Sequence, residues 1–570
     1  MTLNKGVNVR EGESVAAITG RGARVTGLLG TFQKGPVNKP VYCGTLAEAQ
    51  AMFGDDAVAG TTSYFDMVDM YSNGGSMQAA IVNVKGPAAA QALRTYNDID
   101  ASPQPTLTVK AKAYGAYGNS LSVVIANDSR MATRLVAQAS STAISATLQS
   151  VAQLEVGSVL KFDNGTQTEK VVLTTVTPSS SGDGTGAVGW VGGLTNTYTT
   201  ALTTVSSVEF QIIVYRGVIE IARIKGLSKN PDVTFYHTKL VNIDEKNYPI
   251  ETVNVVSPST PLYDQWPAES LTPLLLTGGD DDVDGLESAD WIGSAVNGTG
   301  IYAFESVEGL FRVAVPNPKI NTSPADGYET VLRALLAYAK TKTASAKGFE
   351  VYAEVPFGTA VADAITWAKK FEGRELSVWY DWQTGLVKGA TVVSPIIGAI
   401  LGAAARKDSQ DGIYASVGNH DITLRGTPYY KYSEANDQLM SANNINTITP
   451  NGARTWGAYT LAANPLWRFL NHSEQFNDIA QTLKVETGDI TFKPINDRTK
   501  SMLQRRLDNY FRSKLADGEI TMYTIVISQL GANTLRVNLS IGLVGVAEII
   551  DYVMNFSNTG FVDASVGGAA

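Results

Sequence analysis

The sequence predicts a multidomain protein in which α/β, all-β and α+β parts follow one another. Three observations carry this prediction. The length of 570 residues exceeds that of a typical single domain. Strand-like and helix-like segments alternate on both sides of a long stretch of short strand patterns rich in Thr, Ser and Val. Near the end of the chain, two amphipathic helix patterns precede alternating strands.

The predicted units follow these changes in pattern, with a short extended segment at each end. We expect a middle α/β domain, a sandwich-like all-β insertion on the outside, and a small α+β domain near the C-terminus. The boundaries are residues 1–20 for an N-terminal arm, 21–95 for an α/β segment that packs with the core, 96–265 for the insertion, 266–445 for the middle domain, 446–547 for the C-terminal domain, and 548–570 for a C-terminal arm.

Composition narrows the functional classes. Charged residues make up 17% of the chain and apolar residues 44%, so large cores can form. The net charge of -9 gives no general attraction to nucleic acid. The single cysteine, Cys43, excludes a disulfide within the chain and a cysteine zinc site. The first residues lack the apolar core of a signal peptide, and the longest apolar run, residues 392–405, is interrupted by Pro395. We therefore expect assembly in a cytoplasm and no direct membrane insertion.

The α/β regions contain clear local signals. Residues 46–53 form a short helix pattern that ends at Gly54, and a buried strand follows at residues 81–86. Strands are predicted at residues 349–356 and 375–382, with a helix between them, and a further helix begins after Pro395. A longer helix pattern covers residues 326–342. Its apolar face consists of Val331, Leu332, Leu335, Leu336 and Ala339.

The insertion has short strands separated by Gly-, Ser- and Asn-rich turns. Its least clearly patterned part, about residues 130–204, is predicted to be a peripheral insertion. Residues 177–189 form a loop within it.

The C-terminal domain is predicted from helices at residues 474–485 and 498–516 and from strands at residues 522–528 and 534–544. Asp497 is the expected N-cap of the second helix and Gly518 its stop. The expected buried stripe of this helix is Leu503, Leu507, Phe511 and Leu515. Arg498, Arg505 and Arg512 recur every seven residues on the opposite face.

Enzyme signatures are weak. A subtilisin-like chain order of Asp, His and Ser is excluded for Ser76, because it precedes His237, His420 and His472. The sequence contains no Gly-x-Ser-x-Gly elbow and no Walker A motif. One GxGxxG pattern, residues 184–189, lies in a Ser/Gly loop instead of a strand-to-helix turn. We therefore expect neither catalysis nor a bound cofactor.

One acidic loop partly matches a calcium-binding pattern. Asp280, Asp282, Asp284 and Gly285 fit the first six positions of an EF-hand loop. The twelfth position holds Trp291 in place of the bidentate glutamate. We expect no metal here and retain the three aspartates only as a calcium candidate.

A series of short motifs, in the same order along the chain, resembles the tail sheath proteins of contractile bacteriophage tails and related contractile injection systems. The N-terminal pattern KGVNVRE at residues 5–11 is similar to that family's PGVYVxE opening. The segment WGAYTL at residues 456–461 resembles its WGARTL, with Tyr459 where arginine is usual, and residues 471–473 replace its VRR. The remaining matches are GPVNKPV at residues 35–41 with Phe53-Gly54, SNGG at 72–75, AYGAYGN at 113–119, LTGGD at 276–280, and AAARKD at 403–408 with Gly412.

The resemblance implies a structural protein. In that family the middle domain is subtilisin-like without a working catalytic triad, and the subunits polymerise as a helical stack of six-fold rings around an inner tail tube. Contraction of the sheath drives the tube through the host envelope and leads to genome ejection. The implied partners are other copies of the chain, the tube protein, and baseplate and tail terminator proteins, and the implied location is the virion, after assembly in the host cytoplasm. The alternatives are another structural tail or lattice-forming protein, or a subtilisin-like hydrolase.

The resemblance also implies that both terminal arms join the C-terminal sheets of adjacent subunits. Strand addition would use main-chain hydrogen bonds for affinity and alternate side chains for register. The alternating residues are Val7 and Val9 with Glu11 in the N-terminal arm, and Ile550, Tyr552, Met554 and Phe556 in the C-terminal arm. For the C-terminal segment, an ordinary edge strand of its own domain is the alternative.

The arginine row Arg498, Arg505 and Arg512 is a second candidate surface. It is predicted to face an acidic strip on the inner tube, which the family's C-terminal domain contacts. A solvated basic helix face is the alternative.

Overall fold

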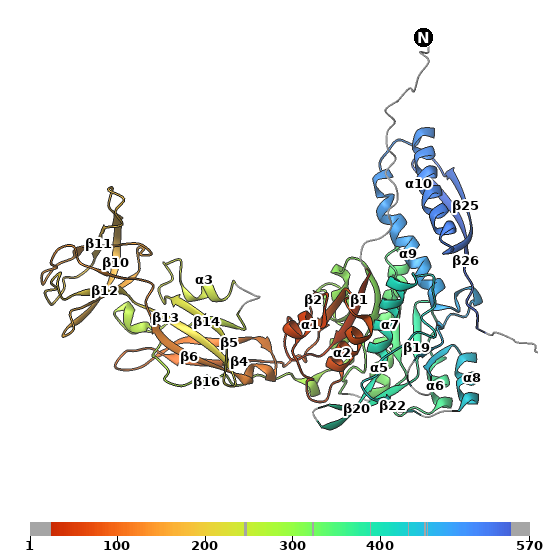
Figure 1. The fold of residues 1–570 in the computed structure, drawn as a ribbon, viewed down its shortest axis with the longest axis horizontal. Coiled ribbons are helices and arrows are strands. Elements are labelled where there is room, and N and C mark those ends of the chain that lie inside the picture. Colours follow the sequence, from red (N-terminus) through yellow and green to blue (C-terminus); the bar gives the residue numbers. More distant parts are fainter. Residues whose placement is uncertain are drawn as a thin grey trace, which may run out of the picture.

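The chain folds into an elongated arrangement of three parts, seen in a computed structural model (Figure 1). The β-rich insertion extends to the left of an α/β body in this view, and the C-terminal part, made of two helices and two strands, rises above the body. The structure describes residues 24–243, 248–321, 324–387, 389–430, 433–449, 452 and 454–548.

The body is built on an eight-stranded sheet whose six central strands are parallel. The order is β2-β3-β1-β17-β18-β19-β23-β24, and only the outermost strands, β2 and β24, run antiparallel to their neighbours. Leu28 of β1 is in register with Ile81 on one side and Ala314 on the other. An N-terminal strand thus sits in the middle of the sheet. The strands are β1 Val25–Gly30, β2 Pro40–Cys43, β3 Ala79–Asn83, β17 Leu310–Ala314, β18 Glu350–Glu354, β19 Leu376–Trp379, β23 Ile445–Ile448 and β24 Thr455–Trp456.

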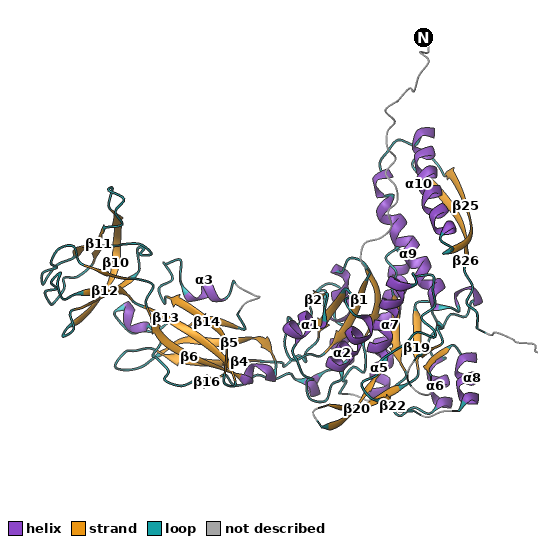
Figure 2. Ribbon diagram, in the orientation of Figure 1, coloured by secondary structure: helices purple, strands orange, loops and turns teal. Residues whose placement is uncertain are grey.

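Helices cover both faces of this sheet, as a buried parallel sheet requires (Figure 2). Successive residues of β1 belong to different hydrophobic cores. Leu28 lies in the core that includes residues of α1, α2 and α7, and Leu29 lies in the core that includes residues of α5, α6 and α8. Helices α2 and α7 touch closely, because a Cβ added to Gly402 would lie 2.2 Å from the Met70 carbonyl oxygen. The helices are α1 Leu46–Phe53, α2 Ser63–Gly74, α4 Ser288–Ile292, α5 Pro324–Ala344, α6 Val361–Ala368, α7 Ile397–Gln410 and α8 Glu434–Ala442.

Several local predictions for the body are confirmed. Helix α1 ends at Gly54, whose φ of 105° is a conformation that favours glycine. Helix α7 begins after Pro395. The five apolar residues expected on one face of the helix from residue 326 are buried in α5.

A small sheet and short 3-10 turns complete the body and its connections. The sheet has the order β21-β20-β22, formed by β20 Trp382–Val387, β21 Ala390–Pro395 and β22 Thr427–Pro428. The 3-10 turns of the chain are η1 Ala116–Ser120, η2 Leu262–Gln265, η3 Val283–Gly285, η4 Gly300–Ser306, η5 Pro465–Trp467 and η6 Gly488–Ile490.

The insertion consists of two β units. In the inner unit, the sheets β15-β5-β4 and β14-β13-β6-β16 enclose a shared core that includes Val109, Ile125 and Ile212. Its elements are β4 Gln91–Asn97, β5 Pro105–Tyr114, β6 Leu121–Asp128, β13 Glu209–Arg216, β14 Ile219–Leu227, β15 Ile250–Asn254, β16 Leu274–Leu275 and the short helix α3 His237–Val241.

The outer unit is formed by the segment for which the sequence pattern was weakest. It is a six-stranded sheet of order β7-β12-β9-β10-β11-β8 with its own core around Phe162, Trp190 and Tyr198. Figure 1 places it at the end of the molecule farthest from the body. The strands are β7 Ala132–Arg134, β8 Ser145–Leu148, β9 Val159–Asp163, β10 Thr168–Pro178, β11 Gly186–Trp190 and β12 Thr204–Ser207.

The insertion is fastened to the body by a short paired neck. Ala90 and Asp280 exchange backbone hydrogen bonds of 2.9 and 3.1 Å. Behind them, the buried Lys85 ammonium pairs with Asp281, whose second oxygen accepts from the Ala116 amide at 3.0 Å. These contacts join the two chain segments that run between the body and the insertion, at residues 85–90 and 280–281.

The C-terminal part contains α9 Leu470–Glu486, α10 Asp497–Ala516, β25 Ile520–Gln529 and β26 Leu535–Leu543. Three details differ from the sequence prediction. The first helix begins at Leu470, before the predicted start at residue 474. The prediction missed this turn because its buried side chains are polar and form no apolar pattern. The N-cap of α10 is Asn496, whose side chain accepts from the Thr499 amide, in place of Asp497. Leu515 is 41% exposed, and Tyr510 packs in the core with Phe511 instead.

No helix in the described part of the chain is long and apolar enough to cross a membrane.

Candidate assembly surface

The C-terminal hairpin of β25 and β26 is a sheet with two open edges. The strands pair from Ile520 with Leu543 to Gln529 with Leu535. Over the described ranges, no third strand adds to either side. A two-stranded sheet is only marginally stable, and each free edge presents unpaired N–H and C=O groups. This surface can therefore accept further strands.

The inner face of the hairpin is only partly covered by its own chain. Tyr523 stacks on Phe511 of α10 with ring centroids 5.7 Å apart, and its hydroxyl donates to Asp508 at 2.7 Å. The other side chains on this face contact the same core but remain half-buried: Ile525, Ile527, Val537, Leu539 and Ile541. On the opposite face, Met522 is 55% and Val526 57% exposed. Strands added at the edges would widen the sheet and remove more of this apolar surface from water.

The predicted arginine row lies on α10. Arg498, Arg505 and Arg512 are exposed, whereas Leu503, Leu507 and Phe511 of the same helix are buried in the core. Arg512 forms an ion pair with Asp508 one turn earlier, and Arg505 Nε donates to the Ser501 carbonyl at 3.4 Å. The row therefore faces outward, as the helical spacing predicts.

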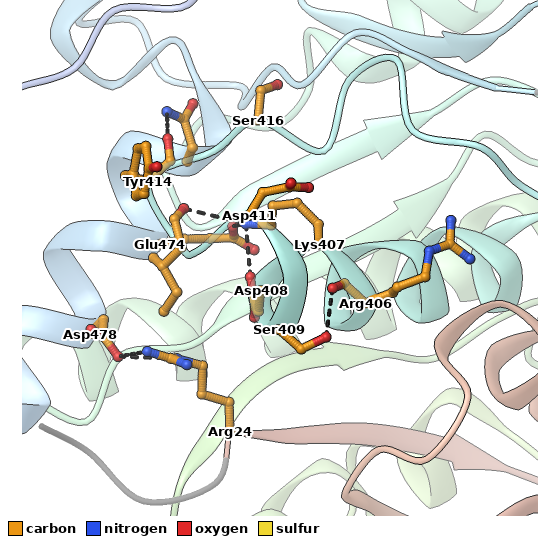
Figure 3. Close-up of polar contacts among 12 residues, drawn as sticks. Arg24, Arg406, Lys407, Asp408, Ser409, Asp411, Tyr414, Ser416, Glu474 and Asp478 are labelled. Atoms are coloured by element: carbon orange, nitrogen blue, oxygen red, sulfur yellow. Dashed lines mark hydrogen bonds and ion pairs between the residues drawn. The ribbon is translucent and has the colours of Figure 1, made fainter. Parts of the chain in front are cut away.

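A cluster of four buried charges joins α9 to the body, and Figure 3 shows three of them, Lys407, Asp408 and Glu474. We call Arg312, Lys407, Asp408 and Glu474 the buried ionic anchor. Arg312 of β17 lies 2.8 Å from Glu474 and 2.7 Å from Asp408, and Lys407 lies 2.9 Å from Glu474 and 2.8 Å from Asp408. Each cation thus touches both anions, and the formal charges cancel.

The electrostatics of the anchor favour the charged forms of Arg312 and Asp408. Burial alone would lower the pKa of Arg312, but the adjacent Asp408 and Glu474 raise it well above its usual value. Burial likewise opposes ionisation of Asp408, and Arg312 and Lys407 nevertheless hold its pKa below the ordinary value. The Tyr352 hydroxyl adds a hydrogen bond of 2.9 Å to Glu474. The result is a closed set of interactions among β17, β18, α7 and α9.

Two further contacts bind α9 to the body. Asn477 donates to the buried Glu350 carboxyl group at 2.7 Å, and burial followed by the nearby Glu474 raises the pKa of Glu350 well above its usual value. Arg24 contacts Asp478 at 3.1 Å (Figure 3). Because Arg24 directly precedes β1, the chain enters β1 from a point held against α9.

The sequence did not reveal this anchor as a site. Its signal is the Arg406-Lys407-Asp408 triplet that ends an otherwise apolar helix, together with Glu474 on a predicted amphipathic helix. A single sequence does not indicate that these distant charges meet.

The other candidate residues are placed as follows. The arm residues Val7, Val9, Glu11, Ile550, Tyr552, Met554 and Phe556 lie outside the described residues. In the acidic loop, Asp282 Oδ2 accepts from the Ala88 amide at 2.7 Å, Asp280 Oδ1 accepts from the Asp282 amide at 2.9 Å, and the Asp284 side chain is 99% exposed. Within the described segments, no group of three or more His, Cys, Asp or Glu side chains is arranged to hold a metal ion.

The histidines belong to three separate environments. His237 Nδ1 lies 3.0 Å from the Thr252 hydroxyl in the insertion, and burial lowers the pKa of His237 to about 3. His420 lies 3.7 Å from Asp411 in the body, and His472 contacts backbone carbonyl groups near α9. None of these contacts joins a histidine to Ser76, the serine that the sequence offers for a hydrolase.

Comparison with solved structures identifies the fold. The chain is similar to the sheath tail protein from Listeria innocua, with a TM-score of 0.54 and 12% identity over 92% of this chain and 93% of that chain. The chain has the fold of a sheath tail protein. Similarity also extends to the sheath tail protein from Desulfitobacterium hafniense (TM-score 0.49, 11% identity, 95% of this chain and 100% of that chain) and to the contracted helical sheath of the anti-feeding prophage (0.49, 11%, 98% and 100%).

No family model and no curated protein sequence matches the chain. The relationship is therefore visible in the fold and in short motifs, not in overall sequence identity.

Proposed function

We propose that this chain is the structural subunit of a contractile sheath. The observation that carries the proposal is the similarity of fold to a sheath tail protein over 92% of the chain. The insertion, the subtilisin-like α/β body and the C-terminal part would then correspond to outer, middle and inner layers of the sheath.

The C-terminal hairpin would be the main joint between subunits. A helical polymer needs heterologous contacts, in which one surface patch binds a different patch on the next copy. The two open edges of β25 and β26 and the half-buried apolar face between them suit the addition of extended segments. Residues 4–11 and 548–558 of adjacent copies are the proposed segments, with Val7, Val9, Tyr552 and Phe556 setting the register.

The buried ionic anchor would transmit force between this joint and the body. During contraction, rigid domains rotate while their linkers remain connected. A cluster of four charges, linked by ion pairs, holds α9 to β17 and α7 across the domain boundary. The C-terminal unit and the body would therefore move together, and the arms would act as the flexible connections.

The exposed arginine row is proposed to face an inner tube. Arg498, Arg505 and Arg512 would bind an acidic strip on the tube protein. The remaining features of the proposal are six-fold rings, baseplate and tail terminator partners, and a place in a phage virion or a related injection system. No ATP site is invoked, since the driving energy would be stored in a metastable extended lattice.

Electron microscopy of the purified chain, alone and co-expressed with its tube protein, tests the proposal. Hollow helical tubes or stacked rings are expected. A second structural role, as a tail or lattice protein of another kind, predicts flat arrays or closed shells. Monodisperse subunits in both preparations would contradict the sheath assignment.

A further inference from the structure

A second contact joins the insertion to the body, apart from the paired neck. Arg216, the last residue of β13, forms two hydrogen bonds with Asp55, which follows helix α1 and Gly54 in the body. Nη2 lies 3.0 Å from Oδ1, and Nη1 lies 3.3 Å from Oδ2. A bidentate pair of this kind fixes the relative orientation of the two groups. The insertion is thus attached to the body at two separate points.

An aromatic ring of the insertion adds to this contact. Tyr117 of η1 has two cations near its ring: the Arg216 guanidinium lies 5.2 Å and the Lys34 ammonium 5.3 Å from the ring centroid. Both are within the ~6 Å over which a cation is attracted to an aromatic face. Lys34 belongs to the body, where its amide donates to the Phe53 carbonyl group at 3.2 Å. We call Lys34, Asp55, Tyr117 and Arg216 the latch.

The charges of the latch support one another across the two parts. The hydrogen bonds with Arg216 lower the pKa of Asp55 below its ordinary value, and the same bonds raise the pKa of Arg216. Burial and then Arg216 lower the pKa of Lys34, whereas Asp55 opposes this effect. Asp55 therefore stabilises a cation from the insertion and a cation from the body.

The latch differs from the neck in its access to water. The side chains of Arg216 and Asp55 are 39% and 57% exposed, so water can hydrate both charges when the pair separates. In the neck, the side chains of Lys85 and Asp281 are only 1% and 11% exposed, and separating them would leave buried charges uncompensated. The neck is therefore a durable attachment, whereas the latch can open and close.

A cleft beside the latch leaves room for movement between the two parts. Its volume is about 550 Å³. A part that is attached at one narrow point can tilt about that point, and a second attachment fixes the angle. The cleft is lined by Ala57, Gly60 and Lys319 from the body and by Tyr117, Ser120 and Arg216 from the insertion.

We propose that the latch sets the angle between the insertion and the body, and that its opening lets the insertion swing about the neck. In the open state, Arg216 and Asp55 are hydrated and the neck alone carries the insertion. Salt favours this state, because the Debye length falls from about 10 Å at 0.1 M to about 3 Å at 1 M ionic strength. The latch is a property of the single subunit. Its use in an assembly, where a swinging insertion would keep contact with neighbours while the body rotates, rests on the proposed function.

Electron paramagnetic resonance distance measurements between two spin labels on the unassembled full chain test the latch. The labels are attached at A47C, on helix α1 of the body, and at S102C, in the turn between β4 and β5 of the insertion, since both positions are exposed. The native Cys43 is buried. A narrow distance distribution is expected at about 0.1 M salt and a roughly twofold broader one at about 1 M, because screening weakens one of the two attachments.

Two variants open the latch without salt, and a third is the matched control. R216Q and D55N each remove one charge of the pair and should give the broad distribution already at low salt. In the control R223Q, the lost ion pair, Arg223 with Glu220 at 2.7 Å, has a similar exposure of 36% and 37% but lies wholly within the insertion. R223Q should therefore keep the narrow distribution of the wild type.

Three results would overturn the proposal. One is a wild-type distribution that does not change with salt, which requires no variant to fold. The others are narrow distributions in both R216Q and D55N, and broadening in R223Q equal to theirs. Because the subunit is unassembled, none of these results depends on whether the protein forms sheaths.

Discussion

Replacing Glu474 by glutamine tests whether the buried ionic anchor stabilises the junction between α9 and the body. The side chain is 1% exposed and contacts Arg312 at 2.8 Å and Lys407 at 2.9 Å. Glutamine keeps the size of the side chain and an oxygen for the Tyr352 hydroxyl, but it removes one of two negative charges. The cluster would then contain two cations and one anion, Asp408, and its net positive charge would be buried away from water.

The expected effect is large for one substitution. Breaking a buried ion pair by removing one partner destabilises proteins by about 3–5 kcal/mol, because the remaining charge is uncompensated. For a folding unit of this size, that free energy corresponds to a lowering of the Tm by roughly 10 °C. Thermal unfolding followed by tryptophan fluorescence measures the change. Proteolysis in the loop between α9 and α10 reports whether the C-terminal part loosens first.

E329Q is the matched control. Glu329 also contacts two cations, Arg333 at 2.7 Å and Lys370 at 2.8 Å, but these cations are 51% and 45% exposed. Water can solvate these two exposed cations, so E329Q should lower the free energy of unfolding by about 1 kcal/mol or less. If E474Q and E329Q lowered the stability equally, the reasoning that burial makes the anchor essential would be refuted.

Three further predictions concern assembly and pH. Deleting residues 1–12 should leave folded monomers with little polymer, and normal sheaths from this truncation in electron micrographs would contradict strand exchange. Charge reversal of Arg498, Arg505 and Arg512 should leave subunit stability within about 1 kcal/mol, because all three are exposed, yet abolish co-sedimentation with the tube protein. Glu354 should make stability fall as the pH rises: burial raises its pKa from 4.5 to about 7, so between these values the folded state holds a proton that the unfolded state has lost. E354Q should remove roughly 3 kcal/mol of that fall between pH 4.5 and pH 8, as read from denaturant midpoints, and an unchanged slope would show that Glu354 does not titrate in this way.

Much of the local structure could be predicted from periodicity. The apolar face of α5 and the alternation in β25 and β26 follow directly from sequence spacing. The buried first turn of α9 was missed because Asn471, His472 and Ser473 are polar and their partners are distant in sequence. Likewise, periodicity does not indicate that β1 lies between β3 and β17, since strand order depends on contacts across more than two hundred residues.

The candidate assembly surface was predictable only in part. The outward arginine row of α10 follows from a seven-residue spacing on a helix, and the structure places it there. The Arg312–Glu474 ion pair of the buried ionic anchor and the contact of His472 with the Val544 carbonyl join residues far apart in the chain, which one sequence cannot pair. The arm residues remain predictions because they lie outside the described part of the protein.

High-resolution cryo-electron microscopy of the assembled polymer tests the central claim most directly. The account predicts a helical sheath in which β25 and β26 form the centre of a wider sheet, with residues 4–11 and 548–558 of neighbouring copies paired to their open edges. A polymer in which this hairpin stays two-stranded, with subunits joined through other surfaces, would contradict it.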